Sequence, residues 1–189
     1  MSIVTLAAPA ETKLITGEEL FAMGDIGPCE LIDGKIVYMS PTGDEHGTIE
    51  FNLGSALKAF VQKHKLGRVT GGEVGIYVHR NPDRVRGADV VFISKERGGN
   101  KPAKGFLQVA PELVVEIMSP EDRWQTVTDK IEEYFSIGVQ RVWIVEPEKR
   151  AVRVYRSPTE HQKLSEPDTL KGEGPLEGFE LPVARFFEE

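Results

Sequence analysis

The sequence has a single cysteine, Cys29, among its 189 residues. An internal disulfide needs two cysteines, so disulfide-stapled folds are excluded and the chain fits a reducing compartment. The sequence also lacks any run of about 20 apolar residues that could cross a membrane, and its N-terminal stretch carries no basic leader. We therefore expect a cytoplasmic protein without membrane contact.

Basic residues are also scarce, with 23 Lys and Arg against 30 Asp and Glu and a formal net charge of −7. Non-specific nucleic-acid binding depends on neutralisation of phosphates by basic side chains, so any nucleic-acid role must be local. A loop carries a basic cluster of Lys95, Arg97, Lys101 and Lys104. Such a cluster can follow a phosphate backbone, although solvated loop charge is the more common explanation.

The composition itself is that of a globular protein, with 40% hydrophobic and 28% charged residues. A chain of this length can bury a core, and neither repeats nor a long linker interrupt it. We expect one domain over residues 1–189, with residues 1–13 and 158–175 peripheral or rich in loops.

Local signals in the first third of the chain predict a short helix and a hairpin. Thr16 followed by Glu19 matches a capping box, which predicts a helix over about residues 17–23. Asp33-Gly34 separates two short apolar runs, and this dipeptide suits the positive φ angles of a two-residue hairpin turn.

A long amphipathic helix is predicted next. Apolar residues recur at three- and four-residue spacing from about residue 45 to 65, and Asp44 is the candidate cap. Strands are predicted over residues 68–79 and 86–94. Residues 95–110 are basic and Gly-rich without a clean period, which predicts a long loop that could act as a flap.

The second half of the chain predicts a strand at 111–118, a helix at about 127–138 and a strand at 141–147. Strand, helix, strand implies a right-handed crossover between parallel strands. Residues 151–157 read as an antiparallel edge strand and residues 180–189 as a short closing helix. The predicted fold is a mixed α/β fold with a central mixed β-sheet flanked by helices and an N-terminal β-hairpin.

The stretch PELVVEIMSP places Glu116 in the middle of an apolar run that reads as a buried strand. Side chains alternate along a strand, so Val114, Glu116 and Met118 share one face. Burying an unpaired carboxylate costs several kcal/mol, so Glu116 must be neutral, paired with a base or bound to a metal ion.

Asp89 poses the same problem at the start of the predicted strand ADVVFIS. If this strand pairs antiparallel with the next across the intervening loop, Asp89 and Glu116 become neighbours. Two close carboxylates repel unless a proton or cation lies between them, and oxygen ligands suit Mg²⁺. Lys130, on the following helix, could reach both acids and stabilise developing charge during metal-assisted hydrolysis.

The stretches ELIDGKIVYMSP, VRGADVVFIS, PELVVEIMSP and DKIEEYFSIGVQRVWIVEP, with His46 between the first two, resemble the Uma2 family. Their order and spacing match over roughly residues 14–187. The family is placed in the PD-(D/E)XK restriction-endonuclease-like superfamily. The resemblance implies a restriction-endonuclease-like core that hydrolyses DNA phosphodiester bonds with Mg²⁺, with Mn²⁺ as a substitute. It also implies a homodimer, because cutting two strands needs two sites.

The resemblance assigns five site residues. Asp89 matches the motif aspartate and Glu116 the motif glutamate, which together would hold the metal. Lys130 matches a lysine that this family carries on the helix. Glu30 matches an acid supplied by the N-terminal region, and His46 matches the histidine that follows the SP turn.

Two positions depart from the pattern. Ala88 replaces the proline that usually precedes the aspartate, a backbone change that we expect to be tolerated. Met118 occupies the place of the superfamily's strand lysine, so activity would depend on Lys130 as its substitute.

Each candidate also has a simpler interpretation. Asp89 could accept backbone N–H groups, and Glu116 could form a structural ion pair with Lys130 or an arginine. Lys130 could be solvated, Glu30 could be a surface acid, and His46 could bond locally. Glu73 follows two glycines and could be a further ligand, although a turn-adjacent acid is the favoured interpretation. Two functional alternatives remain: a catalytically silent nuclease fold used for binding or assembly, and a metal hydrolase of small phosphoesters.

Overall fold

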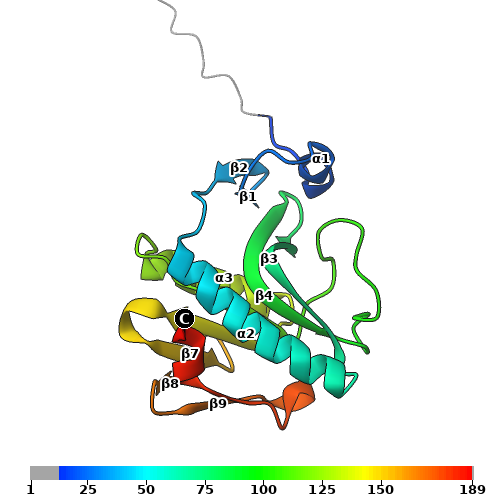
Figure 1. The fold of residues 1–189 in the computed structure, drawn as a ribbon. Helices are drawn as coiled ribbons and strands as arrows, with labels where there is room; N and C mark the ends of the chain where they lie inside the picture. Colours follow the sequence, from blue (N-terminus) through cyan, green and yellow to red (C-terminus); the bar gives the residue numbers. More distant parts are fainter. Residues whose placement is uncertain (1–12, 189) are drawn as a thin grey trace, which may run out of the picture.

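The structure is a computed structural model that describes residues 13–188 (Figure 1). Its α-helices are α1 (Gly17–Ala22), α2 (Asp44–Lys63) and α3 (Trp124–Ser136). Three short 3-10 helices are η1 (Pro147–Lys149), η2 (Gly174–Leu176) and η3 (Val183–Phe187). The strands are β1 (Cys29–Ile32), β2 (Lys35–Tyr38), β3 (Gly67–His79), β4 (Arg84–Ser94), β5 (Leu113–Ile117), β6 (Arg141–Glu146), β7 (Ala151–Tyr155), β8 (His161–Ser165), β9 (Thr169–Lys171) and β10 (Glu180–Pro182).

The main sheet has eight strands. Seven follow the order β2-β1-β4-β5-β6-β7-β8, and β3 pairs with β4 beside this path. The pair β5 and β6 is parallel, as the strand-helix-strand pattern predicted, whereas the other neighbours are antiparallel. The sheet is therefore mixed. Strands β9 and β10 form a separate two-stranded sheet.

The two long helices cover opposite faces of the main sheet. The inner side of α2, including Leu53 and Leu57, packs in one core cluster with Val115 of β5. The inner side of α3 packs in a second cluster, where Ile131 joins Val114. Successive residues of β5 thus point to opposite faces of the sheet. Figure 1 shows α2 crossing the sheet on one side. The predicted class, a mixed sheet flanked by helices with an N-terminal hairpin, is confirmed.

Both N-terminal signals fold as predicted. The Thr16 side chain accepts the N–H of Glu19, and the Glu19 side chain accepts the N–H of Thr16, which completes the capping box of α1. Asp33 and Gly34 turn the β1–β2 hairpin with φ angles of 50° and 73°. This positive-φ pair is the geometry that two-residue hairpin turns require.

Two predicted boundaries are wrong. The N-cap of α2 is Gly43, and Asp44 is instead the first helical residue. Strand β4 begins at Arg84, because it pairs with β3 from there to Ser94. Asp89 therefore lies in the middle of its strand instead of at its start.

The predicted edge strand β7 is an inner strand, since β8 pairs along its whole length. The β8 sequence HQKLS is mostly exposed and polar, so it carries no apolar alternation from which a strand could be predicted. Residues 158–175, expected to be rich in loops, contain β8 and β9. The expected closing helix is β10 followed by η3. Residues 1–12 of the expected peripheral N-terminus lie outside the described residues.

The described residues 95–110 form no helix or named strand, as predicted for the long loop. The loop is nevertheless anchored, because Leu107 bridges to Ile76 of β3 and is buried. The Arg97 guanidinium donates to the carbonyls of Ala110 and Gly138, each at 2.9 Å. Arg97, a member of the basic cluster, therefore stabilises the fold through these hydrogen bonds. In the described part of the chain, no helix is long and apolar enough to span a bilayer.

Two positions on α2 test how the helix is held. Leu53 is fully buried in the core cluster, whereas Phe51, two residues earlier, is 76% exposed. Leu53→Ala should lower the free energy of unfolding by about 2–5 kcal/mol, because it removes buried contacts and leaves a cavity. Phe51→Ala should change it by less than about 0.5 kcal/mol. Urea denaturation of both variants measures the difference, and equal losses would contradict this packing.

Candidate functional site

The candidate site lies at a gap on one edge of β4. Strand β3 occupies the other edge of β4. On the gap side, β1 pairs with β4 at Val85 and β5 pairs with it from Val90 to Phe92. Between these two pairings, side chains and not a strand form hydrogen bonds with the β4 backbone. Glu30 accepts the N–H of Gly87 at 3.1 Å, and Lys130 donates to the Gly87 carbonyl at 3.3 Å. Site residues therefore satisfy backbone groups that would otherwise be buried and unpaired.

Asp89 connects this gap to the end of β5. The β4–β5 register pairs Val90 with Val115, so one further step places Asp89 opposite Glu116. Asp89 Oδ2 accepts the N–H of Ile117 at 2.6 Å, and the residue is only 4% exposed. The antiparallel pairing predicted from sequence is thus observed, and it makes Asp89 and Glu116 neighbours.

Glu116 is held through both carboxylate oxygens. The Tyr134 hydroxyl donates to Oε1 at 2.5 Å, and Lys130 Nζ donates to Oε2 at 3.1 Å. Burial raises the pKa of Glu116 to about 8 against the opposing charge of Lys130, and the charge of Asp89 adds to the rise. A cation placed near Glu116 would favour its ionised form.

Lys130 lies between two acids. Its Nζ is 3.1 Å from Glu116 Oε2 and 3.2 Å from Glu30 Oε1, and the Gly87 carbonyl is its third acceptor. Burial alone would lower the pKa of Lys130, but the charges of Glu116 and Glu30 outweigh burial and raise it. The ammonium therefore keeps its charge at neutral pH.

Glu30 lies behind Lys130 in a buried network of ion pairs. Arg86 Nη1 donates to Glu30 Oε2 at 2.8 Å, and Arg86 Nε donates to Glu133 Oε2 at 2.6 Å. Burial would raise the pKa of Glu30, but Lys130 and Arg86 outweigh it and lower the pKa below its ordinary value. Glu30 is thus an ionised anchor of Lys130.

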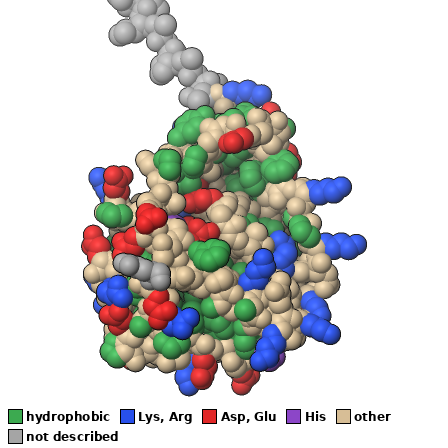
Figure 2. Space-filling view, in the orientation of Figure 1, with side chains coloured by type: hydrophobic (Ala, Val, Ile, Leu, Met, Phe, Trp, Pro, Cys, Tyr) green, Lys and Arg blue, Asp and Glu red, His purple; other side chains and the backbone are tan. Residues whose placement is uncertain are grey.

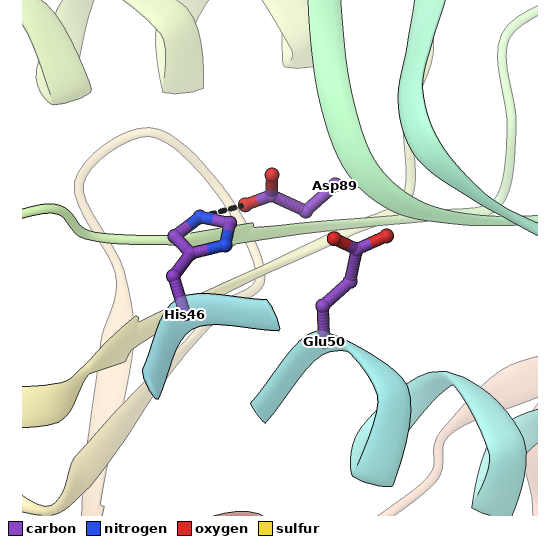
Figure 3. A group of neighbouring side chains, drawn as sticks. All are labelled: His46, Glu50 and Asp89. Atoms are coloured by element: carbon purple, nitrogen blue, oxygen red, sulfur yellow. Dashed lines mark ion pairs between the residues drawn. The ribbon is translucent and has the colours of Figure 1, made fainter. Parts of the chain in front are cut away.

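Helix α2 supplies the opposite wall of the site. Figure 3 shows His46 and Glu50 of α2 directed toward Asp89 of β4. His46 Nε2 is 3.4 Å from Asp89 Oδ2, and Glu50 Oε1 accepts the N–H of Gly72 at 2.7 Å. Burial would lower the pKa of His46, but its hydrogen bond to Asp89 and the charge of Asp89 raise it. Sequence reasoning missed Glu50, although its i,i+4 spacing from His46 puts both on one helix face.

Glu73 also belongs to the site, contrary to the simple interpretation of a turn-adjacent acid. It lies at a bulge of β3, where the register shifts between Gly71 and Val74, and its φ is 55°. Glu73 as a whole is exposed, but its carboxyl group points toward Gly87 of β4. A Cβ atom added to Gly87 would lie only 2.5 Å from Glu73 Oε2. Burial of this carboxyl and the charge of Asp89 raise its pKa.

A pocket of about 350 Å³ opens over these groups. Four of the five predicted site residues line it, namely His46, Asp89, Glu116 and Lys130, whereas Glu30 does not. Acidic side chains are visible in the hollow between the β1–β2 hairpin and the start of α2 (Figure 2). A neighbouring pocket of about 420 Å³ shares His46 with the first and extends to Trp124.

The donors around the pocket suit a divalent cation. His46, Glu50 and Asp89 each offer a ligand atom, and these atoms lie within 4.8 Å of one another. His46 Nδ1 is buried without a hydrogen-bond partner among the described residues. The carboxylate oxygens suit Mg²⁺ or Mn²⁺, whereas an imidazole nitrogen is the more usual ligand of Zn²⁺ and other transition metals. The residues present are therefore compatible with a divalent metal centre.

The buried network predicts a large effect of Arg86. Arg86→Met removes a cation that is 8% exposed and takes one charged partner from Glu30, which keeps Lys130, and one from Glu133, which keeps Arg84. We expect a loss of about 3–5 kcal/mol in the free energy of unfolding. The control Arg185→Met breaks a surface pair with Glu188, at 62% and 54% exposure, and should cost less than about 1 kcal/mol. Urea denaturation measures both, and similar losses would show that burial does not govern these pairs.

Comparison with known proteins places this chain in a family. Among curated proteins, none matches the chain. A solved structure from Anabaena variabilis ATCC 29413, described as "a putative nuclease belonging to DUF820", matches with a TM-score of 0.77 and 24% sequence identity. The match covers 92% of this chain and 97% of that chain, and it shows the restriction-endonuclease-like fold.

The model of the Uma2 family, described as "Putative restriction endonuclease", matches residues 18–184. This range includes all five predicted site residues. The resemblance seen in the sequence is confirmed: the chain belongs to the Uma2 family.

Proposed function

We propose that the protein is a Mg²⁺-dependent endonuclease that hydrolyses DNA phosphodiester bonds, with Mn²⁺ able to replace Mg²⁺. The observation that carries this proposal is the pocket that Asp89, Glu116, Lys130 and His46 line together. Membership of a family described as "Putative restriction endonuclease" supports the reaction class. Asp89 and Glu116 are the proposed metal ligands, and His46 and Glu50 extend the donor set on the α2 side.

A divalent cation in this pocket would neutralise charge on the phosphate and lower the pKa of a water molecule. The chain's own residues orient the reaction. Asp89 is fixed by the N–H of Ile117 and Glu116 by Tyr134 and Lys130, so both carboxylates are preorganised. The Lys130 ammonium is proposed to stabilise the negative charge that develops on the phosphate oxygens.

The remaining predicted residues take different roles. Glu30 does not line the pocket, so we propose that it positions Lys130 and leaves contact with the metal to other acids. His46 lies against Asp89 and is proposed to hold that carboxylate or to bind the cation through a ring nitrogen. We therefore propose that Glu30 serves Lys130, whereas Asp89 and Glu116 serve the metal.

A DNA substrate requires a surface for phosphates despite the net charge of −7. Figure 2 shows Lys and Arg side chains along the right-hand flank of the molecule, over the loop 95–110 and the C-terminal end of α2. Acidic side chains are more frequent on the opposite flank. We propose that the basic flank contacts the DNA backbone, that the working assembly is a homodimer because two strands need two sites, and that the protein acts in the cytoplasm.

Metal binding and cleavage test the proposal. Asp89→Asn and Glu116→Gln keep the side-chain shapes but remove charge that the cation needs. We expect saturable Mn²⁺ binding to the wild type by calorimetry, at least tenfold weaker binding to each variant, and loss of plasmid cleavage in Mn²⁺. The control Glu177→Gln neutralises an exposed acid outside the pocket and should change neither measurement.

The outcomes separate the alternatives. A wild type that neither binds Mn²⁺ nor cuts plasmid would support the catalytically silent binding or assembly module, which the net charge and Met118 at the usual lysine position favour. Metal binding with hydrolysis of a small phosphoester but not of DNA would identify a small-molecule hydrolase. Either result would overturn the endonuclease proposal.

The basic flank gives a second prediction. Lys101 and Lys104 are exposed, so the double variant Lys101→Glu/Lys104→Glu should weaken binding of a labelled duplex at low salt. The slope of log affinity against log salt should fall by roughly 2, if each lysine neutralises one phosphate. The control Lys163→Glu/Lys171→Glu makes the same charge change at β8 and β9. Fluorescence anisotropy measures both, and equal slopes would rule out this flank as the contact surface.

A further inference from the structure

We propose that Tyr134 is a positioning residue that fixes the Glu116 carboxylate for cation binding. This inference rests on the proposed function, because it concerns a ligand of the same metal centre. Tyr134 lies on α3 one turn after Lys130, so both side chains come from one helix face. The resemblance to the family assigns Tyr134 no role.

The position of Tyr134 is closely defined. The residue is fully buried in the core cluster between α3 and the sheet, together with Ile131 and Val114. Its hydroxyl lies 2.5 Å from Glu116 Oε1 and 3.5 Å from the Gly87 carbonyl. Buried side-chain packing restricts the ring to one place, so the hydroxyl is a rigid donor.

Tyr134 complements Lys130 by holding the other oxygen of Glu116. The terminal torsion of a glutamate is broad, so a single contact would leave its carboxylate plane free to rotate. Lys130 holds Oε2 and Tyr134 holds Oε1, and these two donors together define the plane. A carboxylate has about four lone-pair directions, so two donors still leave room for a cation.

The hydroxyl donates to Glu116 Oε1, because an ionised carboxylate oxygen can only accept a hydrogen bond. Tyr134 is fully buried and does not line the pocket, so its proposed role is exerted through Glu116.

Tyr134→Phe tests the inference, because it keeps the ring and removes only the hydroxyl. Partners of metal ligands typically contribute 10- to 100-fold to metal affinity, so we expect Mn²⁺ to bind at least tenfold more weakly by calorimetry. Plasmid cleavage should approach the wild-type rate at saturating Mn²⁺. The control Tyr155→Phe removes the hydroxyl of another buried tyrosine away from the pocket and should shift the affinity less than twofold.

A double-variant comparison separates positioning from general structural damage. In the Glu116→Gln background, Tyr134→Phe should weaken Mn²⁺ binding by less than twofold, because the residue through which it acts is already altered. An equal loss in both backgrounds, or an unchanged affinity of Tyr134→Phe, would overturn the inference while the endonuclease proposal stands. A wild type without saturable Mn²⁺ binding would overturn the proposed function and the inference with it.

Discussion

The candidate site depends on one constraint: buried polar groups on the edge of β4 must be paired, and no strand is there to pair them. The Gly87 N–H and carbonyl are instead satisfied by Glu30 and Lys130. These side chains are charged, so they need partners of their own, and the pairing continues through Arg86 to Glu133. The residues proposed for chemistry therefore also close the sheet, since an unpaired buried charge would cost several kcal/mol.

This pairing divides the charges of the site into two unequal halves. On the α3 side, Glu30, Glu116 and Glu133 are matched by Lys130, Arg86 and Arg84. On the α2 side, Asp89, Glu50 and Glu73 lie around His46, and the charge of Lys130 also acts on Glu73. Negative charge is thus in excess on the α2 side of the pocket. A divalent cation near Asp89 would balance that excess, and it would also lie beside Glu116, which faces Asp89 across the β4–β5 pairing.

The sequence was sufficient where a residue conflicted with its local pattern. Glu116 and Asp89 could be identified because acids stand out in apolar strands, and pairing across the loop followed from antiparallel geometry. Glu50 could not be identified in this way, because an acid on a helix is ordinary until the sheet beneath it is known. The inward position of the Glu73 carboxyl depends on a bulge in β3, and no residue pattern predicts that register shift. Strand β8 was missed because its pairing comes from β7 rather than from apolar residues of its own.

The position of Lys130 on α3 affects which other residues the site needs. A lysine at the position of Met118 would stand just past the end of β5, whereas Met118 is instead half-buried and lines the neighbouring pocket beside Trp124. Lys130 must reach the acids from α3 with a long, flexible side chain whose ordering costs entropy. Glu30 offsets this cost by giving the ammonium a second carboxylate, and Arg86 keeps Glu30 ionised. Because Lys130 reaches the acids from α3 with Glu30 as a partner, the N-terminal hairpin that carries Glu30 is part of the site.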